Sequence, residues 1–585
     1  MTRRVTAALA ALAAALLAAC GSDSATEPSP APGPGPGPGP VPVHSVQITP
    51  NAPALTVGQT LQLTATLADA TGKPITGRTV TWTSSAQQYV TVSGTGLLTG
   101  VAAGTAKITA TAEGKSAQIT VTVTQPDVAV ASVEITTALD TLEAYDVVPL
   151  AAVVRDEDNQ VLNGRQVTWT SSNPAVASVN ATTGVLTGHD RGTVTITATS
   201  EGVSGTATRV VVIKYRSITA GTMHACDIAS GGIAWCWGLN GAEGRIGDPN
   251  MGSNAYRAVP YRVSETIRFK MLSTSGRHTC GVATDNRAYC WGYNGWGGLG
   301  SGTNIPSSPT PIPVAGGILF KSVTAGADHS CGISTADKAY CWGHADWRQL
   351  GDGSSGYTLS PVAVALNESV KAIEAGPGFT CAITMAGAAY CWGANSIGQI
   401  GDGQPISYGN TFVAQPTKVA TALSFASIDV SNQYTCATTP TGSAYCWGRD
   451  GGRFGRGAGN DSSSPVAAAT GLSLRSISTG NDHACGVAQD FGIWCWGSND
   501  NGRLGVPLPN GSTTPVRVAG NLSGQEVAAA GIATGSAAHT CAISVDRLTV
   551  LCWGRNDVGQ LGNGSTSDAT ASNATPVIVV GQKPL

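Results

Sequence analysis

Cysteine is the residue type whose number and spacing stand out in this sequence. Of fifteen cysteines, fourteen fall into seven consecutive pairs, and their members lie ten residues apart, or eleven in the last pair. Zinc sites use much closer spacings and usually include histidine, whereas this spacing suits opposite positions of a β-hairpin. We therefore predict seven hairpin disulfides: Cys226–Cys236, Cys280–Cys290, Cys331–Cys341, Cys381–Cys391, Cys436–Cys446, Cys485–Cys495 and Cys541–Cys552.

The odd cysteine, Cys20, follows a segment typical of export signals. Disulfides persist outside the reducing cytosol, so the paired cysteines already predict an exported protein. Arg3 and Arg4 precede a short apolar run that ends at residue 19, and this run is shorter than the ~20 residues needed to span a bilayer. The segment 17–21 (LAACG) resembles the lipobox of bacterial lipoproteins. The resemblance implies a signal peptide over 1–19 and a lipid on Cys20; the alternative is a plain secretory signal with an incidental cysteine.

Residues 20–42 are too rich in proline and glycine to fold. Prolines and glycines alternate over most of this segment, which removes backbone donors and side chains that could pack. Such a tether extends on the order of 40 Å. By resemblance to lipoprotein sorting rules, glycine rather than aspartate at position 21 favours the outer membrane or cell surface. We expect contact with the membrane through the lipid alone.

Five histidines also invite a chemical interpretation, because each stands two residues before the first cysteine of a pair. The other two pairs have Phe379 and Tyr434 at that position, so we interpret it as a packing position rather than a metal or general-base site. No Ser/His/Asp set, carboxylate pair in matched contexts or phosphate-binding glycine loop stands out. We expect no catalytic residue, no metal and no cofactor. The histidines are His224, His278, His329, His483 and His539.

The cysteine pairs belong to a repeat that fills residues 214–585. Seven units recur every 49 to 56 residues, and each offers four short apolar runs separated by glycine-rich turns, which is the pattern of a propeller blade. Every unit contains a Trp–Gly dipeptide, at Trp237, Trp291, Trp342, Trp392, Trp447, Trp496 and Trp553. A Gly-x-x-Gly loop follows at 244–247, 297–300, 398–401, 502–505 and 559–562. These two motifs resemble the repeat of the regulator of chromosome condensation family, and the resemblance implies a seven-bladed β-propeller.

Each unit supplies its four strands from contiguous sequence, so we expect the ring to close by packing between the last and first blades. The family name suggests guanine-nucleotide exchange, but function does not follow from fold, and we do not expect that activity from an exported protein.

Two segments of similar sequence, 43–125 and 126–213, precede the propeller. They share the sequence motifs VTWTSS and G-x-L-T-G. In both, threonine alternates with apolar residues such as Val194, Ile196 and Ala198, as expected for the strands of a β-sandwich. They resemble group 2 bacterial immunoglobulin-like domains of invasin- and intimin-type adhesins. Trp82 and Trp169 are expected in the cores. The acidic run 156–158 is interpreted as a hairpin turn, with a calcium site as the alternative.

The sequence thus predicts an all-β protein: two immunoglobulin-like β-sandwiches followed by a seven-bladed β-propeller. Only 12% of residues are charged and the net charge is −3, without the basic stripe that nucleic-acid binding requires. We expect a monomeric, surface-anchored binding or adhesion protein whose ligand is a protein or a glycan. The alternatives are an enzyme or enzyme subunit acting on polysaccharide, and a structural envelope component.

Loop aromatic residues are the candidate ligand contacts, because aromatic side chains anchor many binding sites. Five residues beyond the repeat tryptophan, two neighbouring units carry tryptophan where others carry Ile397, Asn501 or Val558. The alternative is that this position is half-buried in every unit and prefers apolar residues. The candidates are Trp296, Trp347, Tyr357, Tyr408 and Phe412.

Overall fold

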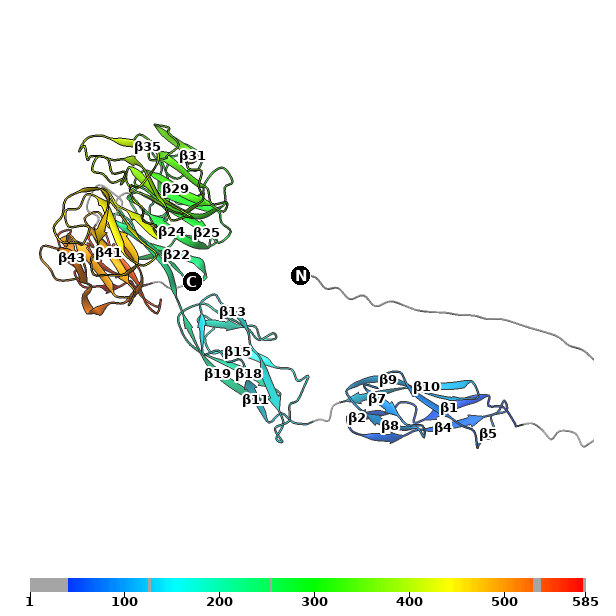
Figure 1. The fold of residues 1–585 in the computed structure, drawn as a ribbon. Coiled ribbons are helices and arrows are strands. Elements are labelled where there is room, and N and C mark those ends of the chain that lie inside the picture. Colours follow the sequence, from blue (N-terminus) through cyan, green and yellow to red (C-terminus); the bar gives the residue numbers. More distant parts are fainter. Residues whose placement is uncertain (1–39, 125–127, 253–254, 530–537, 582–585) are drawn as a thin grey trace, which may run out of the picture. The chain divides into compact units, whose positions relative to one another are not determined.

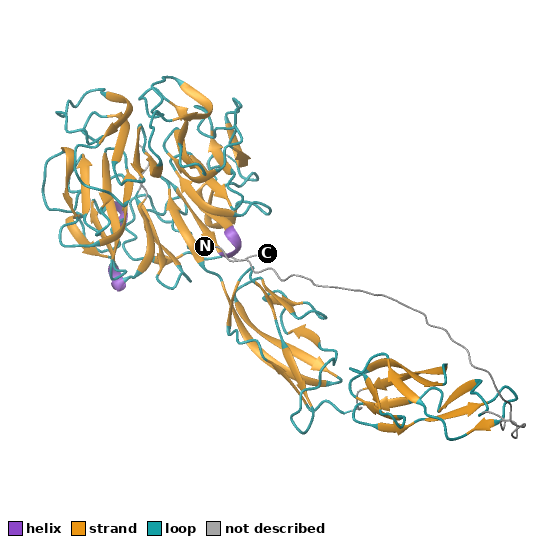
Figure 2. Ribbon diagram, turned by 45° about the vertical axis from the view of Figure 1, so that its right-hand side comes forward, coloured by secondary structure: helices purple, strands orange, loops and turns teal. Residues whose placement is uncertain are grey.

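The computed structural model describes residues 40–124, 128–252, 255–529 and 538–581. These residues form strands and loops with three one-turn 3-10 helices, at Ser230–Gly232, Asp500–Gly502 and Ala519–Asn521 (Figure 2). The predicted all-β class is confirmed. The signal peptide, Cys20 and the tether up to residue 39 lie outside the described residues. None of the described helices is long and apolar enough to cross a membrane.

The chain divides into two compact units, one up to Ala129 and one from Val130 onward. The first unit is an immunoglobulin-like sandwich whose long hairpin β9–β10 buries alternate residues, among them Ile108 and Val121 (Figure 1). Its sheets have the strand orders β2-β10-β9-β6, β1-β4-β5 and β3-β8-β7. The strands are β1 (Ser45–Thr49), β2 (Ala54–Thr56), β3 (Thr60–Gln62), β4 (Thr64–Ala68), β5 (Pro74–Ile75), β6 (Thr81–Ser84), β7 (Val90–Val92), β8 (Leu97–Gly100), β9 (Gly104–Ala112) and β10 (Lys115–Thr124).

The second unit begins with a sandwich of the same design, in which Val194, Ile196 and Ala198 are buried as predicted. Its sheets run β12-β19-β18-β15, β13-β17-β16 and β11-β14. The strands are β11 (Ser132–Ile135), β12 (Thr141–Glu143), β13 (Val147–Pro149), β14 (Ala152–Arg155), β15 (Thr168–Ser171), β16 (Ala177–Val179), β17 (Val185–Gly188), β18 (Gly192–Ser200) and β19 (Val203–Val212).

The shared tryptophan explains the glycine that opens the second shared sequence block. Gly184 has φ +69°, and a Cβ there would lie 2.8 Å from the indole of Trp169; only glycine combines that backbone with so close a contact. Gly96 meets Trp82 in the same way. Trp169 is buried as expected, whereas Trp82 is half-buried and packs against the edge of its core.

The acidic run of the second sandwich forms the expected turn. Asp156 Oδ1 accepts the backbone N–H of Gln160 at 2.7 Å, just as Asp69 Oδ1 in the first sandwich accepts that of Lys73 at 3.0 Å. Within the described ranges, no group of three or more His, Cys, Asp or Glu side chains could hold a metal ion.

Glu143 joins the second sandwich to the first propeller blade. Its carboxylate receives Arg216 at 2.5 Å and the hydroxyl of Ser230 at 2.9 Å, and Arg191 donates to the carbonyl of Leu548 in the last blade. A shared apolar cluster continues from the sandwich into blades 1 and 7. The chain therefore enters the propeller at the end of the blades that carries the turns between second and third strands.

The propeller has seven four-stranded antiparallel sheets, each built from consecutive strands. Blades 1 to 4 comprise β20 (Tyr215–Ala220), β21 (His224–Ala229), β22 (Ile233–Leu239), β23 (Tyr256–Arg262); β24 (Phe269–Thr274), β25 (His278–Ala283), β26 (Ala288–Tyr293), β27 (Ser307–Pro313); β28 (Phe320–Ala325), β29 (His329–Ser334), β30 (Ala339–His344), β31 (Tyr357–Ala363); β32 (Val370–Ala375), β33 (Phe379–Thr384), β34 (Ala389–Ala394), β35 (Phe412–Lys418). Blades 5 to 7 comprise β36 (Ser427–Val430), β37 (Tyr434–Thr438), β38 (Ala444–Gly448), β39 (Ser462–Ala468); β40 (Leu474–Thr479), β41 (His483–Ala488), β42 (Ile493–Gly497), β43 (Ser512–Arg517); β44 (Gly524–Ala529), β45 (His539–Ser544), β46 (Val550–Gly554), β47 (Val577–Ile578).

Since every blade is contiguous in sequence, the predicted closure by packing is confirmed. The first strand β20 packs on β44 and β45, and the indole N–H of Trp237 in blade 1 donates to the carbonyl of Gln560 in blade 7 at 2.8 Å. The fourteen cysteines form the seven predicted disulfides, with paired Cα atoms 4.0 to 4.1 Å apart. Each disulfide joins the second and third strands of one blade.

Four of the five repeated histidines, His224, His278, His329 and His483, make hydrogen bonds to the neighbouring blade, in agreement with the packing interpretation, and His539 makes none to a described residue. His329 Nε2 lies 2.9 Å from Thr380 Oγ1 in the next blade, and Thr380 donates to the carbonyl of Gln349 at 2.8 Å. The indole N–H of Trp392 donates to the same carbonyl at 2.8 Å. The repeat tryptophan and hydroxyl of one blade thus hold the loop between the third and fourth strands of the preceding blade.

Candidate functional site

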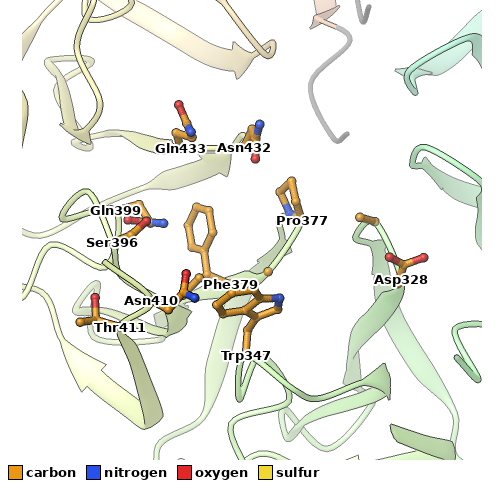
Figure 3. Close-up of a pocket in the computed structure, with 13 residues that line it drawn as sticks. Asp328, Trp347, Pro377, Phe379, Ser396, Gln399, Asn410, Thr411, Asn432 and Gln433 are labelled. Atoms are coloured by element: carbon orange, nitrogen blue, oxygen red, sulfur yellow. The ribbon is translucent and has the colours of Figure 1, made fainter. Parts of the chain in front are cut away.

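A pocket of about 310 Å³ opens among the loops of blades 3, 4 and 5. It lies at the end of the blades that carries the connections between strands one and two and between strands three and four. We call this end the loop face; the second sandwich joins the opposite end. Figure 3 shows Trp347 and the pair Asn432 and Gln433 on opposite sides, with Phe379 between them. The pocket is lined by Ala327, Asp328, Trp347, Pro377, Gly378, Phe379, Ala394, Ser396, Gln399, Asn410, Thr411, Asn432 and Gln433.

Trp347 forms the aromatic wall of the pocket. It lies in the loop between β30 and β31, and its backbone N–H donates to Gln349 Oε1 at 3.0 Å, two residues before the carbonyl that Thr380 and Trp392 hold. The indole is 37% exposed. Gly378 lies beside it: a Cβ there would lie 3.5 Å from the indole, in ordinary van der Waals contact. One backbone hydrogen bond thus holds the loop at Trp347, and part of the indole remains accessible.

The remaining walls are mostly polar and uncharged. Gln433 Oε1 accepts a hydrogen bond from Arg449 at 2.6 Å, and the buried Gln399 Oε1 accepts the N–H of Ile397 at 2.9 Å. By contrast, Ser396, Asn410 and Asn432 make no side-chain hydrogen bond to any other residue that the structure describes. Three neutral polar side chains thus line the pocket without a partner among the described residues; Ser396 and Asn432 are half-buried and Asn410 is exposed.

Asp328 is the single ionisable residue among the described residues that line the pocket. Burial raises the pKa of its carboxyl, and the positive charges of Arg277 and His344 partly offset that rise. Within the described part of the chain its side chain has no hydrogen-bond or ion-pair partner. The pocket therefore has little charge, and what it has is negative.

The aromatic residues singled out from the sequence all lie on the loop face, and one of them, Trp347, lines this pocket. Trp296 is 41% exposed and its ring centroid lies 4.9 Å from that of His344 and 6.2 Å from that of Tyr357. Phe412 lies under the guanidinium of Arg348, 5.5 Å from its ring centroid. We call the exposed residues Trp296, Trp347, Tyr357, Tyr408 and Phe412 the aromatic ridge.

Exposure distinguishes the two tryptophans from their repeat equivalents. Ile397, Asn501 and Val558 are half-buried, whereas both indoles are exposed. The two tryptophans are 41% and 37% exposed, so more than half of each residue is covered, and the alternative of a half-buried apolar position stays open. Ligand contact by the ridge stays a prediction.

Several pocket residues were not expected from the sequence. Asn432 and Gln433 lie in the turn between the first and second strands of blade 5, and Pro377 and Gly378 lie in the same turn of blade 4. The sequence did contain a signal for this region, because blades 4 and 5 replace the repeat histidine with Phe379 and Tyr434. These two departures from the repeat lie in or next to the turns that line the pocket.

The first strands of the blades surround an axial channel, and its carboxylates correct the expectation that no carboxylate pair occurs in matched contexts. Glu374 and Asp429 occupy the same repeat position on the innermost strands β32 and β36, so carboxylates do occur in matched contexts. They line a cavity of about 250 Å³ together with Glu526. Burial raises the pKa of Glu374 and of Asp429, and the neighbouring charge raises that of Glu374 further. Thr324 donates to Glu374 at 2.8 Å and the N–H of Thr479 donates to Asp429 at 2.6 Å, which ties both carboxyls to the channel wall.

Fold and site together define an all-β protein in which paired sandwich domains precede a disulfide-linked propeller with a loop-face pocket. Comparison with known families agrees. The model of the bacterial Ig-like domain (group 2) matches residues 42–123 and 129–211. Models of the regulator of chromosome condensation (RCC1) repeat match 285–333, 337–383, 492–543 and 474–503. The chain therefore combines two group 2 bacterial immunoglobulin-like domains with RCC1-type propeller repeats.

Curated relatives match part of the chain. The chain is 29% identical over 144 residues to the ultraviolet-B receptor UVR8 of Arabidopsis thaliana, covering 24% of this chain and 32% of that protein. It is 28% identical over 148 residues to the mitochondrial RCC1 domain-containing protein RUG3 of the same plant, covering 24% and 33%. The chain thus spans about a third of the length of these curated relatives. The solved structure of human WBSCR16 matches with a TM-score of 0.51 at 17% identity, covering 60% of this chain and 94% of that one, which shows the fold.

Proposed function

We propose that this protein is a lipid-anchored, surface-exposed binding protein whose propeller captures an extracellular protein or glycan on its loop face. The observation that carries the proposal is the aromatic ridge: five exposed aromatic side chains lie on the loop face of blades 2 to 4, and one of them, Trp347, lines the pocket. Exposed aromatic clusters are commonly the anchors of recognition sites.

The order of the domains supports this function. The sandwich domains and the tether precede the propeller, and the chain joins the propeller at the end opposite the loop face. A binding surface placed there stays clear of the chain's own attachment. RCC1-type repeats in a chain with immunoglobulin-like domains also agree with a protein-binding propeller.

An enzyme acting on polysaccharide is the competing function, and Glu374 with Asp429 would be its catalytic carboxyls. Glycosidases need such a pair on either side of a bound sugar, with both groups free to react. Here both carboxyls accept hydrogen bonds from the wall of the axial channel. We therefore assign them to the propeller's interior and propose that the protein is not an enzyme.

Crosslinking on intact cells tests the proposal. The full-length protein should crosslink to a defined set of surface molecules, identified by mass spectrometry, and the double variant Trp296→Ala with Trp347→Ala should lose them while keeping its melting temperature. Tyr256→Ala is the matched control, because it removes an aromatic ring of 44% exposure from blade 1. Undiminished capture by a folded double variant would place the binding surface elsewhere.

A further inference from the structure

The loop-face pocket differs in chemistry from the aromatic ridge. The open surface of the Trp347 indole provides one flat apolar wall, extended by Pro377 and Phe379 (Figure 3). A pyranose ring presents a patch of C–H bonds on one face and hydroxyl groups around its rim. An indole packs well against such a C–H patch, because both surfaces are apolar and rigid.

The other walls offer what the rim of a sugar requires. Ser396, Asn410 and Asn432 carry a hydroxyl and two amides without a partner among the described residues, and each amide provides both donors and an acceptor. Hydroxyl groups of a ligand also both donate and accept, so they can satisfy groups of this kind. A purely apolar ligand that covered these half-buried and exposed groups would separate them from water without replacing those hydrogen bonds, at a cost of about 1–3 kcal/mol each.

Charge and size narrow the ligand class further. Among the lining residues that the structure describes there is no lysine or arginine, and Asp328 is the one ionisable group, so acidic sugars would meet repulsion rather than a cation. The volume of about 310 Å³ lies at the small end of ligand sites, about 300–1,000 Å³. A protein interface buries about 800 Å² on each partner, which this pocket alone cannot supply.

We infer that the pocket binds a single neutral pyranoside unit of a glycan, with the C–H face of the sugar against Trp347 and its hydroxyls bonded to Ser396, Asn410 and Asn432. The inference rests on the proposed function, since it names the ligand class for the same face. The ridge residues Trp296 and Tyr357 lie outside the pocket lining and are not assigned to this sugar unit.

Titration of the full-length protein with methyl glycosides tests the inference. The probes are the methyl pyranosides of glucose, galactose, mannose and N-acetylglucosamine, with sialyllactose as the anionic comparison, followed by tryptophan fluorescence and saturation-transfer NMR. At least one neutral glycoside should bind saturably, and more tightly than sialyllactose. Trp347→Ala and Asn432→Ala should each weaken that binding on the order of tenfold.

Three further variants separate binding from folding. Gly378→Ala places a methyl group against the indole without a steric clash, so it should weaken glycoside binding while the melting temperature stays unchanged. Tyr256→Ala and Asn481→Ala are the matched controls and should leave binding unchanged. Asn481 has the repeat position of Asn432, in blade 6, and lies outside the pocket lining.

The outcomes distinguish this inference from the proposed function. Glycoside binding that all pocket variants leave intact would overturn the pocket as the sugar site. If no glycoside binds but cell-surface capture persists and depends on Trp296 and Trp347, the face binds a protein, and only the sugar inference fails. If neither glycosides nor cell-surface molecules bind, both proposals fail.

Discussion

His329 Nε2 lies 2.9 Å from the hydroxyl of Thr380 in the next blade, and that hydroxyl donates to the carbonyl of Gln349 at 2.8 Å. Because the hydroxyl proton points to Gln349, Thr380 accepts the Nε2–H of His329. The three groups form one buried bridge between blades 3 and 4. The same bridge holds the loop that carries Trp347.

Removing the hydroxyl from this bridge should destabilise the propeller. Thr380→Val leaves His329 and the Gln349 carbonyl each one hydrogen bond short, so we expect the free energy of unfolding to fall by about 1–3 kcal/mol in urea titration. In a His329→Phe background, which copies the phenylalanine of blade 4, Thr380→Val should cost less. Equal costs in both backgrounds would show that the imidazole and the hydroxyl are not coupled.

The junction between blades 7 and 1, where the ring closes, has no hydrogen-bonded bridge of this kind. A substitution that supplies one should therefore stabilise the protein. Ala225 stands in blade 1 where Thr380 stands in blade 4, and neither ring nitrogen of His539 has a partner among the described residues. Blade 6 also has alanine there, Ala484, and the facing Tyr434 donates instead to the carbonyls of Gly480 and His483 at 3.0 and 2.6 Å.

His539→Tyr should reproduce that arrangement, with the carbonyls of Gly221 and His224 as acceptors. We expect the free energy of unfolding to rise by about 1 kcal/mol, measured by urea titration. The reverse change, Tyr434→His, should lower it. A destabilised His539→Tyr protein would mean that the two alanine junctions differ in shape.

The channel carboxyl of Glu526 predicts a dependence of stability on pH. Burial raises its pKa to about 7, above the ordinary value of about 4.3. Between about pH 4 and pH 7 the folded protein therefore binds more protons than the unfolded chain, and the free energy of unfolding falls as the pH rises.

In the Glu526→Gln variant, the free energy of unfolding should fall by about 1–3 kcal/mol less over this pH range than it does in the wild type. The measurement is the difference in unfolding free energy between variant and wild type at pH 4.5 and pH 8. Burial of the histidines lowers their pKa values, to about 3 for His329, which costs stability in acid, but that effect is common to both proteins and cancels in the difference. A difference that does not change with pH would contradict the prediction; exposed Glu157→Gln is the control.

Each hairpin disulfide should contribute to the stability of its own blade. Replacing Cys436 and Cys446 by alanine should lower the free energy of unfolding by about 2–3 kcal/mol, the value for a loop of this length in the chain-entropy model. Thiol labelling of the denatured, unreduced protein should detect none of the fourteen propeller cysteines. Labelling of propeller cysteines without reductant would contradict the pairing.

Attachment to the membrane should depend on Cys20. Cys20→Ser should yield soluble or unprocessed protein, because the variant lacks the thiol that would carry the lipid, and a lipid anchor supplies the apolar area that holds such a protein on the membrane. Membrane fractionation measures the outcome. Unchanged fractionation of the variant would exclude the lipid as the anchor.

The fold could be predicted from the sequence because each blade repeats the same short sequence motifs. The Trp–Gly dipeptide and the cysteine pair recur in every unit and the Gly-x-x-Gly loop recurs in most of them, so one unit explains the others. The sequence predicted the ridge only in part, since exposure of Trp296 and Trp347 follows from loop shape rather than from periodicity. The pocket was not predicted, because Asp328, Trp347, Pro377 and Asn432 come from three blades and meet only when the ring forms.

Local sequence could not predict that His539 lacks a hydrogen-bond partner among the described residues either. His539 has the same neighbours as His278, in the shared tripeptide His-Thr-Cys, and the two differ only in what the next blade provides. That partner, Ala225, stands at the other end of the propeller sequence. Only the closed ring brings the two positions together.

The arrangement of one disulfide inside each contiguous blade bears on how the protein matures. The first cysteine of each pair bonds to the next cysteine along the propeller chain, and a loop of about ten residues closes on the order of 10–100 ns. The two thiols of one pair therefore meet more often than thiols of different blades, because a longer loop is less favourable to close. The correct set of seven bonds then follows from local pairing, and no bond has to wait for the ring to close.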